Sequence, residues 1–185
     1  MSGTADRMRV PPLAPHERDQ RQAALVKRAG AEFGVFTTLV RNPDVFADFL
    51  PLGERLLRRS TLDPRERELL IMRVAWRCHA PYEWSHHEVI GRAAGLTDDD
   101  LTALAAGTVD NSDPPRAVLL CAADELVRPH RLSDTAWSDL AERYPTEQII
   151  EICMLVGQYA MLAGVLNSLG VQIEEGYPIP AWART

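Results

Sequence analysis

Apolar residues recur along most of the chain at the three- and four-residue spacing of an α-helix. No segment shows the regular apolar and polar alternation of a half-buried strand, and no glycine-rich phosphate-binding loop occurs. Residues 69–76 are apolar at nearly every position, which predicts a central helix that is buried on most sides. The pattern predicts an all-α fold, a single-domain helical bundle of about seven or eight helices.

Capping residues and prolines indicate where the helices begin and end. Asp63 precedes Pro64, and Glu66 three residues after the cap predicts a capping box. Pro51 and Gly53 are expected to kink or divide the helix in which they lie. Residues 33–40 are apolar but of undecided type. Further starts are expected at Asn42, Pro81, Thr97, Asp113 and Ser133, and ends at Gly95, Gly107 and Gly170.

The two ends of the chain lack this periodicity. Residues 1–15 are rich in proline and are expected to form an extended arm that could lie on a partner subunit. Residues 176–185 also contain prolines and are expected to extend over the surface. The 185-residue length suits one domain, so residues 16–175 are expected to form a single all-helical domain.

The most apolar stretch, residues 149–166, approaches the length of a membrane span. Glu151 and Gln158 interrupt it and Asn167 flanks it, so a buried core or interface helix is the preferred interpretation and no membrane partner is expected. Long apolar helices of this kind also favour a homo-oligomer, with a trimer, a dimer and a hexamer all left open.

Composition and charge limit the partners and the location. The net charge of -6 and the pI near 5.4 argue against nucleic acid, which requires clustered basic residues. The first ten residues lack the apolar core of a signal peptide, which favours a cytoplasmic protein. Cys78, Cys121 and Cys153 are far apart and match no Cys-x-x-Cys or metal-ligand spacing, so they are expected to be buried free thiols.

Groups that can transfer protons concentrate between residues 63 and 96. On a helix, Glu68 shares a face with apolar residues three, four and seven positions further on. Burial there would raise the pKa of its carboxyl and suit a proton shuttle. The alternative is an exposed side chain paired with Arg65 or Arg73.

Glu83 and His87 are four residues apart and would be neighbours on one helix face. A carboxylate beside an imidazole orients the ring and makes an acid/base pair near neutral pH, although an ordinary surface pair has the same spacing. Amides at the helix N-terminus near Tyr82 could also receive an anionic group. Adjacent helical positions point about 100° apart, so His86 and His87 are not expected to serve one site.

A metal site is the minor alternative. His79, Glu83 and His87 could form a row on one face, but the His-Glu-x-x-His spacing is absent, and no metal is expected. Tyr82 and Trp84 are more often core or interface residues than substrate contacts.

The spacing of Glu68, Ala80, Glu83 and His87 resembles that of the carboxymuconolactone decarboxylase and alkylhydroperoxidase-D superfamily, an all-helical group. Its peroxidatic branch carries a Glu, the two cysteines of a Cys-x-x-Cys pair and a His at these positions. Both thiols are absent here, which disables a thiol peroxidase because thiolate attack is its first step. The resemblance covers most of residues 35–175, including the late segment VGQYAMLAGVLNSLGV.

The segment Tyr82-Glu83-Trp84 followed by His87 is instead similar to the decarboxylase-like branch. This resemblance implies decarboxylation of a small cyclic carboxylate or lactone without a cofactor: a dienolate forms as carbon dioxide leaves and is then protonated on carbon. His87 would be the proton donor, Glu83 its orienting partner and Glu68 a second acid/base group.

The resemblance also suggests which side chains contact the substrate. These are Tyr82, Trp84 and His86, together with Arg73 or Arg77 as the group that holds a carboxylate. Another acid/base enzyme, such as an isomerase, hydratase or cyclase acting on a cyclic metabolite, stays open because the scaffold hosts several activities. A non-catalytic ligand-binding oligomer is a further alternative.

Overall fold

A computed structural model of the chain describes residues 8–109 and 113–183. Within these ranges every regular element is helical: nine α-helices and 3-10 turns at Pro15–Glu17 and Ala181–Ala183. The all-α prediction is confirmed. The nine helices of the described residues exceed the expected seven or eight. The segment of undecided type, residues 33–40, contains the short helix Gly34–Leu39.

The helices follow one another along the chain in this order: α1 (Gln20–Ala29), α2 (Gly34–Leu39), α3 (Pro43–Arg58), α4 (Pro64–Arg77), α5 (Pro81–Ala93), α6 (Asp98–Ala106), α7 (Pro114–Val127), α8 (Asp134–Ala141) and α9 (Thr146–Leu169).

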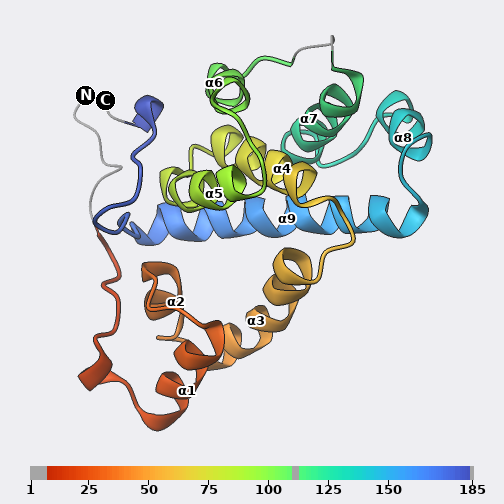
Figure 1. The fold of residues 1–185 in the computed structure, drawn as a ribbon. Helices are drawn as coiled ribbons and strands as arrows, with labels where there is room; N and C mark the ends of the chain where they lie inside the picture. Colours follow the sequence, from red (N-terminus) through yellow and green to blue (C-terminus); the bar gives the residue numbers. More distant parts are fainter. Residues whose placement is uncertain (1–7, 110–112, 184–185) are drawn as a thin grey trace.

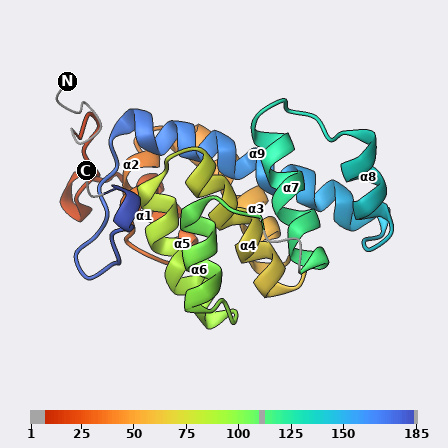
Figure 2. The ribbon, with the colours of Figure 1, turned by 90° about the horizontal axis from the view of Figure 1, so that it is seen from above.

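The long helix α9 runs through the middle of the molecule (Figure 1). Helices α4 to α8 lie on one side of it and α1 to α3 on the other. Figure 2 shows α7 and α8 near the start of α9 and α5 near its end. Apolar residues of α9 such as Ile152 and Leu155 join a core with α4, α7 and α8. The fold therefore leaves α5, α9 and the first three helices facing one another.

Helix α9 is long and apolar enough to cross a membrane by length and composition, and it alone is so among the described residues. Its most apolar window is 50% buried inside the protein. It packs against α3, α4, α7 and α8. These contacts give the helix a place in the protein core.

The predicted helix ends agree with the observed ones where local chemistry decides them. Asp63 accepts hydrogen bonds from the backbone of Arg65 and Glu66, and Gly95 follows α5 with a φ of 97°, a conformation that glycine adopts without strain. The predicted capping box is wrong, because the Glu66 carboxylate accepts a hydrogen bond from the hydroxyl of Tyr144 at 2.9 Å instead.

The predicted division of the helix at Pro51 is not found, since α3 runs from Pro43 to Arg58 with Pro51 inside it. The alternative of a kink stays a prediction. Pro51 is exposed, so water can bond the carbonyl oxygen that loses its partner one turn earlier.

The predicted N-terminal arm and C-terminal tail lie partly outside the described residues, at 1–7 and 184–185. The described part of the arm has no helix before Pro15. The backbone N–H groups of Arg9 and Val10 both donate to the carbonyl of Leu169, at 2.9 and 3.1 Å. This part of the arm therefore rests on the end of α9 in its own chain.

Candidate functional site

A cavity of about 360 Å³ lies between α1–α3 on one side and α5 and α9 on the other. Its volume is in the range of small-molecule sites. Aromatic and aliphatic side chains form most of its wall: Phe33, Val35, Phe36, Phe49, Leu50, Leu57, Leu162 and Leu166. A small ring compound fits such a wall.

Helix α5 supplies several polar side chains of the wall. Tyr82, Glu83, His86, His87 and Ile90 all line the cavity, and their spacing of one, three and four residues defines one broad helix face. The expectation that His86 and His87 serve different sites is wrong. The cavity is wide enough to include both side chains despite the angle between adjacent positions.

His87 is held by a carboxylate from the neighbouring helix. Its Nδ1 lies 2.7 Å from Oε2 of Glu68, which is fully buried on α4. Burial alone would raise the pKa of Glu68, but His87 and Arg67 hold that pKa below its ordinary value. The carboxylate thus favours a proton on Nδ1 and leaves Nε2 for chemistry. The partner of His87 is Glu68 and not Glu83, because the packing of α4 on α5 brings these two side chains together.

Glu83 lies one turn before His87 and is only 2% exposed. Neither of its carboxyl oxygens has a hydrogen-bond partner among the described residues. Burial raises the pKa of Glu83 well above its ordinary value. Burial therefore favours the neutral carboxylic acid, whose O–H group can donate to a ligand in the cavity.

His86 has a carboxylate partner of its own. Its Nε2 lies 2.6 Å from Oε2 of Glu174, in the segment after α9. The other oxygen of Glu174 accepts hydrogen bonds from the backbone N–H of Gly34 at 2.6 Å and from the Tyr82 hydroxyl at 2.8 Å. Burial opposes ionisation, but these donors lower the pKa of Glu174 to about 2. Sequence reasoning missed Glu174, since nothing in its surroundings along the chain points to His86.

Three of the predicted substrate contacts lie away from the cavity. Arg73 and Arg77 both bind the carboxylate of Asp124, because their side of α4 faces α7. Trp84 projects from α5 toward α6, where its ring packs edge-on against Trp182 at 5.6 Å. The expectation that these side chains hold the substrate is corrected accordingly.

Two other cations line the cavity instead. Arg28 in the last turn of α1 and Arg58 in the last turn of α3 are exposed, and neither has an ion-pair partner in the part of the chain that the structure describes. Glu54 is also in the wall, and its Oε1 lies 3.9 Å from Nε of Arg59. No sequence signal separates Arg28 and Arg58 from other surface arginines.

Residues 8–109 and 113–183 contain no group of three or more His, Cys, Asp or Glu side chains arranged to hold a metal ion. The possible row of His79, Glu83 and His87 is not formed. His79 lies in the turn before α5, with a φ of 48°, and its ring packs near Trp182 at 6.3 Å.

All three cysteines are free and lie within the described residues, and none of them lines the cavity. Cys78 and Cys153 are partly buried, whereas Cys121 is exposed, contrary to the expectation of a buried thiol. Burial raises the pKa of Cys78 and of Cys153, which disfavours their nucleophilic thiolates.

Comparison with known proteins agrees with these features. Residues 43–125, which include Glu68, Glu83 and His87, match the model of the carboxymuconolactone decarboxylase family. No curated protein matched the sequence. The family match and the fold support the superfamily that the sequence resembles.

Solved structures share the fold over nearly the whole chain. An uncharacterized peroxidase-related protein from Ralstonia eutropha JMP134, described as an alkylhydroperoxidase AhpD core, is 18% identical with a TM-score of 0.76, over 92% of this chain and 95% of that one. A cysteine-to-alanine variant of the debrominase Bmp8, in complex with 2,3,4-tribromopyrrole, is 21% identical with a TM-score of 0.72, over 90% and 91%. Apo Bmp8 is 20% identical with a TM-score of 0.72, over 91% and 94%. At these identities the likeness establishes an AhpD-like fold.

Proposed function

We propose that this chain, which has an AhpD-like fold and matches the carboxymuconolactone decarboxylase family over residues 43–125, is an acid/base enzyme that decarboxylates a small cyclic carboxylate or lactone without a cofactor. One observation carries the proposal. Glu83, a buried and unpartnered carboxylic acid, lies one helical turn from the Glu68–His87 pair in the wall of an apolar cavity.

Glu83 is suited to stabilise the oxygen atom of the substrate on which negative charge develops. When the bond to the carboxylate breaks, carbon dioxide leaves and the electron pair moves through the ring to the carbonyl oxygen, which gives a dienolate. The O–H of Glu83 donates a hydrogen bond to that oxygen. A donor already fixed in a cavity of low polarity stabilises this charge strongly, because it does not have to reorient.

His87 suits the second step, the return of a proton to carbon. As an imidazolium, it donates from Nε2 to the ring carbon, while Glu68 holds the proton on Nδ1. The Glu68 carboxylate also stabilises the positive charge of the ring before transfer. The substrate thus loses carbon dioxide and gains one proton, which the solvent restores to His87.

The rest of the cavity suits an anionic ring compound. Arg28 and Arg58 carry positive charge in its wall and would attract a carboxylate from solution. The aromatic wall surrounds a flat ring and disfavours a charged carboxylate relative to neutral carbon dioxide.

The comparisons support this choice of ligand. One structural neighbour is a debrominase in complex with a brominated pyrrole, which is itself a small ring. That neighbour has a cysteine replaced by alanine, whereas no cysteine lines the cavity of the present chain. The side chains that line the cavity of the present chain therefore favour proton transfer over thiol chemistry.

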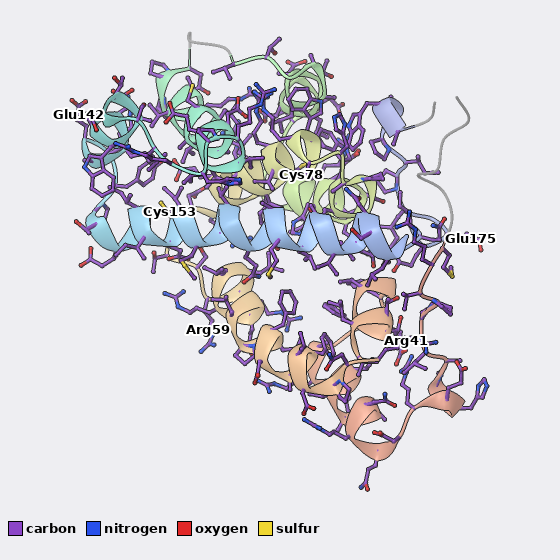
Figure 3. All side chains as sticks on the ribbon, turned by 180° about the vertical axis from the view of Figure 1, so that it is seen from behind. Arg41, Arg59, Cys78, Glu142, Cys153 and Glu175 are labelled. Carbon is purple, nitrogen blue, oxygen red and sulfur yellow. The ribbon has the colours of Figure 1, made fainter. Side chains whose placement is uncertain are left out.

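Carbon dioxide release from carboxymuconolactone tests the proposal. We expect turnover by the wild-type protein and a loss of about 100-fold or more in kcat for Glu83→Gln and for His87→Gln. Glu142→Gln and His16→Gln are matched controls, because both side chains are exposed and neither is part of the cavity wall. Figure 3 labels Glu142 at the end of α8. Wild-type rates in the Glu83 and His87 variants, or no release by the wild-type protein, would refute the decarboxylase.

A further inference from the structure

The cavity wall contains a second histidine–carboxylate pair that the proposed decarboxylation does not use. His86 and Glu174 lie 2.6 Å apart, and His86 lines the same cavity as His87. The two histidines are neighbours on α5, so they approach a bound ligand from directions about 100° apart.

Aromatic rings fix the orientation of His86. Tyr82 stacks on it with ring centroids 4.5 Å apart and an interplanar angle of 29°, and Tyr177 stacks at 4.2 Å and 26°. These nearly parallel rings cover its two faces, and Phe33 meets it edge-on at 4.7 Å. The ring can therefore offer a ligand only its edge.

Glu174 determines which nitrogen of that edge is available. The backbone of Gly34 and the hydroxyl of Tyr82 hold one of its oxygens, so the other stays directed at Nε2 of His86. An ionised carboxylate favours the proton on Nε2. Nδ1 has no hydrogen-bond partner among the described residues and is left as a proton acceptor.

We infer that His86 is a second catalytic acid/base residue, positioned by Glu174, and that the substrates are unsaturated lactones whose ring double bond moves as a proton passes between two ring carbons. The inference rests on the proposed function, because it uses the same cavity and the same hydrogen bond from Glu83 to the dienolate oxygen.

The step balances without an oxidant or reductant. Nδ1 of His86 removes a proton from the carbon next to the carbonyl, and the electron pair of that C–H bond enters the ring to give the dienolate. His87 then donates its proton to the far end of the conjugated system. One C–H bond breaks, another forms, and the double bond shifts by one position.

The competing explanation is structural. The same contacts tie the segment after α9 to α5 and to the start of α2, and this could be their whole role. A catalytic role differs in one respect: it requires a particular protonation state of His86. The titratable groups that face His86 are Glu174, Tyr82 and Tyr177.

Conversion of α-angelica lactone to its conjugated isomer in D2O, followed by proton NMR, tests the inference. The wild-type protein should exchange the proton beside the carbonyl and form the isomer. We expect His86→Gln to lower the isomerisation rate by about 100-fold or more. Glu174→Gln should have a similar effect, because its amide N–H₂ would face Nε2 and move the imidazole proton to Nδ1, the nitrogen that must accept.

Glu175→Gln is the matched control and should isomerise at the wild-type rate, since this exposed neighbour is outside the cavity wall. Figure 3 labels Glu175 in the same segment. The pH profile of isomerisation should lose the limb that reports the proton acceptor in His86→Gln, whereas the contribution of the donor His87 should remain. Unchanged isomerisation and an unchanged profile in both variants would overturn the inference, even if Glu174→Gln lowered the unfolding temperature. So would the absence of isomerisation by the wild-type protein.

Carbon dioxide release measured on the same variants separates the two proposals. Glu175→Gln should release carbon dioxide from carboxymuconolactone at the wild-type rate, because this exposed side chain lies outside the cavity wall. Isomerisation without carbon dioxide release would refute the decarboxylase and leave the second acid/base residue standing. Carbon dioxide release without isomerisation would do the reverse.

Discussion

Glu83 combines three properties that a side chain kept only for stability would not have together. It is buried, it has no hydrogen-bond partner among the described residues, and burial raises its pKa. An unpaired buried polar group destabilises a fold by about 1–3 kcal/mol. Such a group is retained more readily where function needs it than where only folding does.

This destabilisation should depend on pH. The pKa of Glu83 is higher in the folded than in the unfolded protein, so its contribution to stability is largest below the unfolded value of about 4.3 and falls as pH rises toward the folded value. The loss is about 1.4 kcal/mol for each pH unit in that window. Glutamine does not ionise and escapes this loss. The unfolding free energy of Glu83→Gln, relative to that of the wild-type protein, should therefore rise from pH 4 to pH 8.

Urea unfolding at the two pH values measures the gain. Glu142→Gln is the control, because its exposed carboxylate should change the unfolding free energy little at either pH. A difference between wild type and Glu83→Gln that is the same at both pH values would contradict a raised pKa.

At the scale of single residues, the sequence predicts which side chains matter better than it predicts their partners. Spacing along one helix singles out Glu68, Glu83 and His87. Only the packing of α4 on α5 shows that Glu68 is hydrogen-bonded to His87. It also shows that the Glu83 carboxyl has no hydrogen-bond partner among the described residues. Glu174 lies 88 positions from His86, too far for any local pattern to connect them.

Among the elements, α3 forms the wall opposite α5 and α9. Gly53 lines the cavity, and a Cβ atom there would come within 3.5 Å of the Gln158 side-chain nitrogen, an ordinary contact. A larger side chain at this position would therefore point into the space that a ligand occupies, without a clash in the backbone.

We accordingly expect Gly53→Leu to block the site while the protein stays folded. Glycine is about 1 kcal/mol less favourable than alanine inside a helix, so the variant should unfold at the same temperature or higher. Its catalytic efficiency should fall at least tenfold through a higher KM. Thermal unfolding and steady-state kinetics check both parts, with Gly53→Ala as the control of minimal bulk. Unchanged kinetics in Gly53→Leu would place the substrate elsewhere.

The helix boundaries were largely predictable, because caps are local. Asp63, Thr97 and Ser133 each accept hydrogen bonds from the first turn that they begin. Two predictions about helix ends fail because the tertiary surroundings of the residue decide the outcome. Glu66 turns to a hydroxyl on another part of the chain, and α3 continues through Pro51 because that residue faces water.

The whole molecule joins a region that matches the family model to a region that does not. The match begins at the start of α3, so α1 and α2 lie outside it, yet both contribute to the cavity wall. Arg28 and Phe33 come from this unmatched part. We therefore expect substrate choice to depend on side chains that a comparison limited to residues 43–125 would miss.

The expected homo-oligomer stays a prediction, and so does the expected cytoplasmic location. Helix α9 now suggests where two copies would meet. Ile150, Met154 and Met161 are 58%, 47% and 53% exposed. Their helical spacing places them on one face together with Gly157 and Gly164.

This face is complementary to itself, as a twofold contact requires. In an antiparallel pair centred near Gly157, Ile150 would lie close to Gly164 of the partner subunit and Met154 close to Met161 of the partner subunit. A dimer or a hexamer contains such a twofold axis, whereas a simple trimer does not. Met154→Lys should lower the molar mass in light scattering, and Val89→Lys, at an exposed apolar position on α5, should not. A monomeric wild-type protein would contradict the prediction.

The proposed decarboxylation uses proton transfer in a cavity that no cysteine lines. The most direct measurement is carbon dioxide release from carboxymuconolactone by a variant in which Cys78, Cys121 and Cys153 are all replaced by serine, compared with His87→Gln. We expect the cysteine-free variant to keep a rate within about threefold of wild type and His87→Gln to lose about 100-fold or more. Loss of carbon dioxide release in the cysteine-free variant, together with a wild-type rate in His87→Gln, would contradict the proposed proton chemistry.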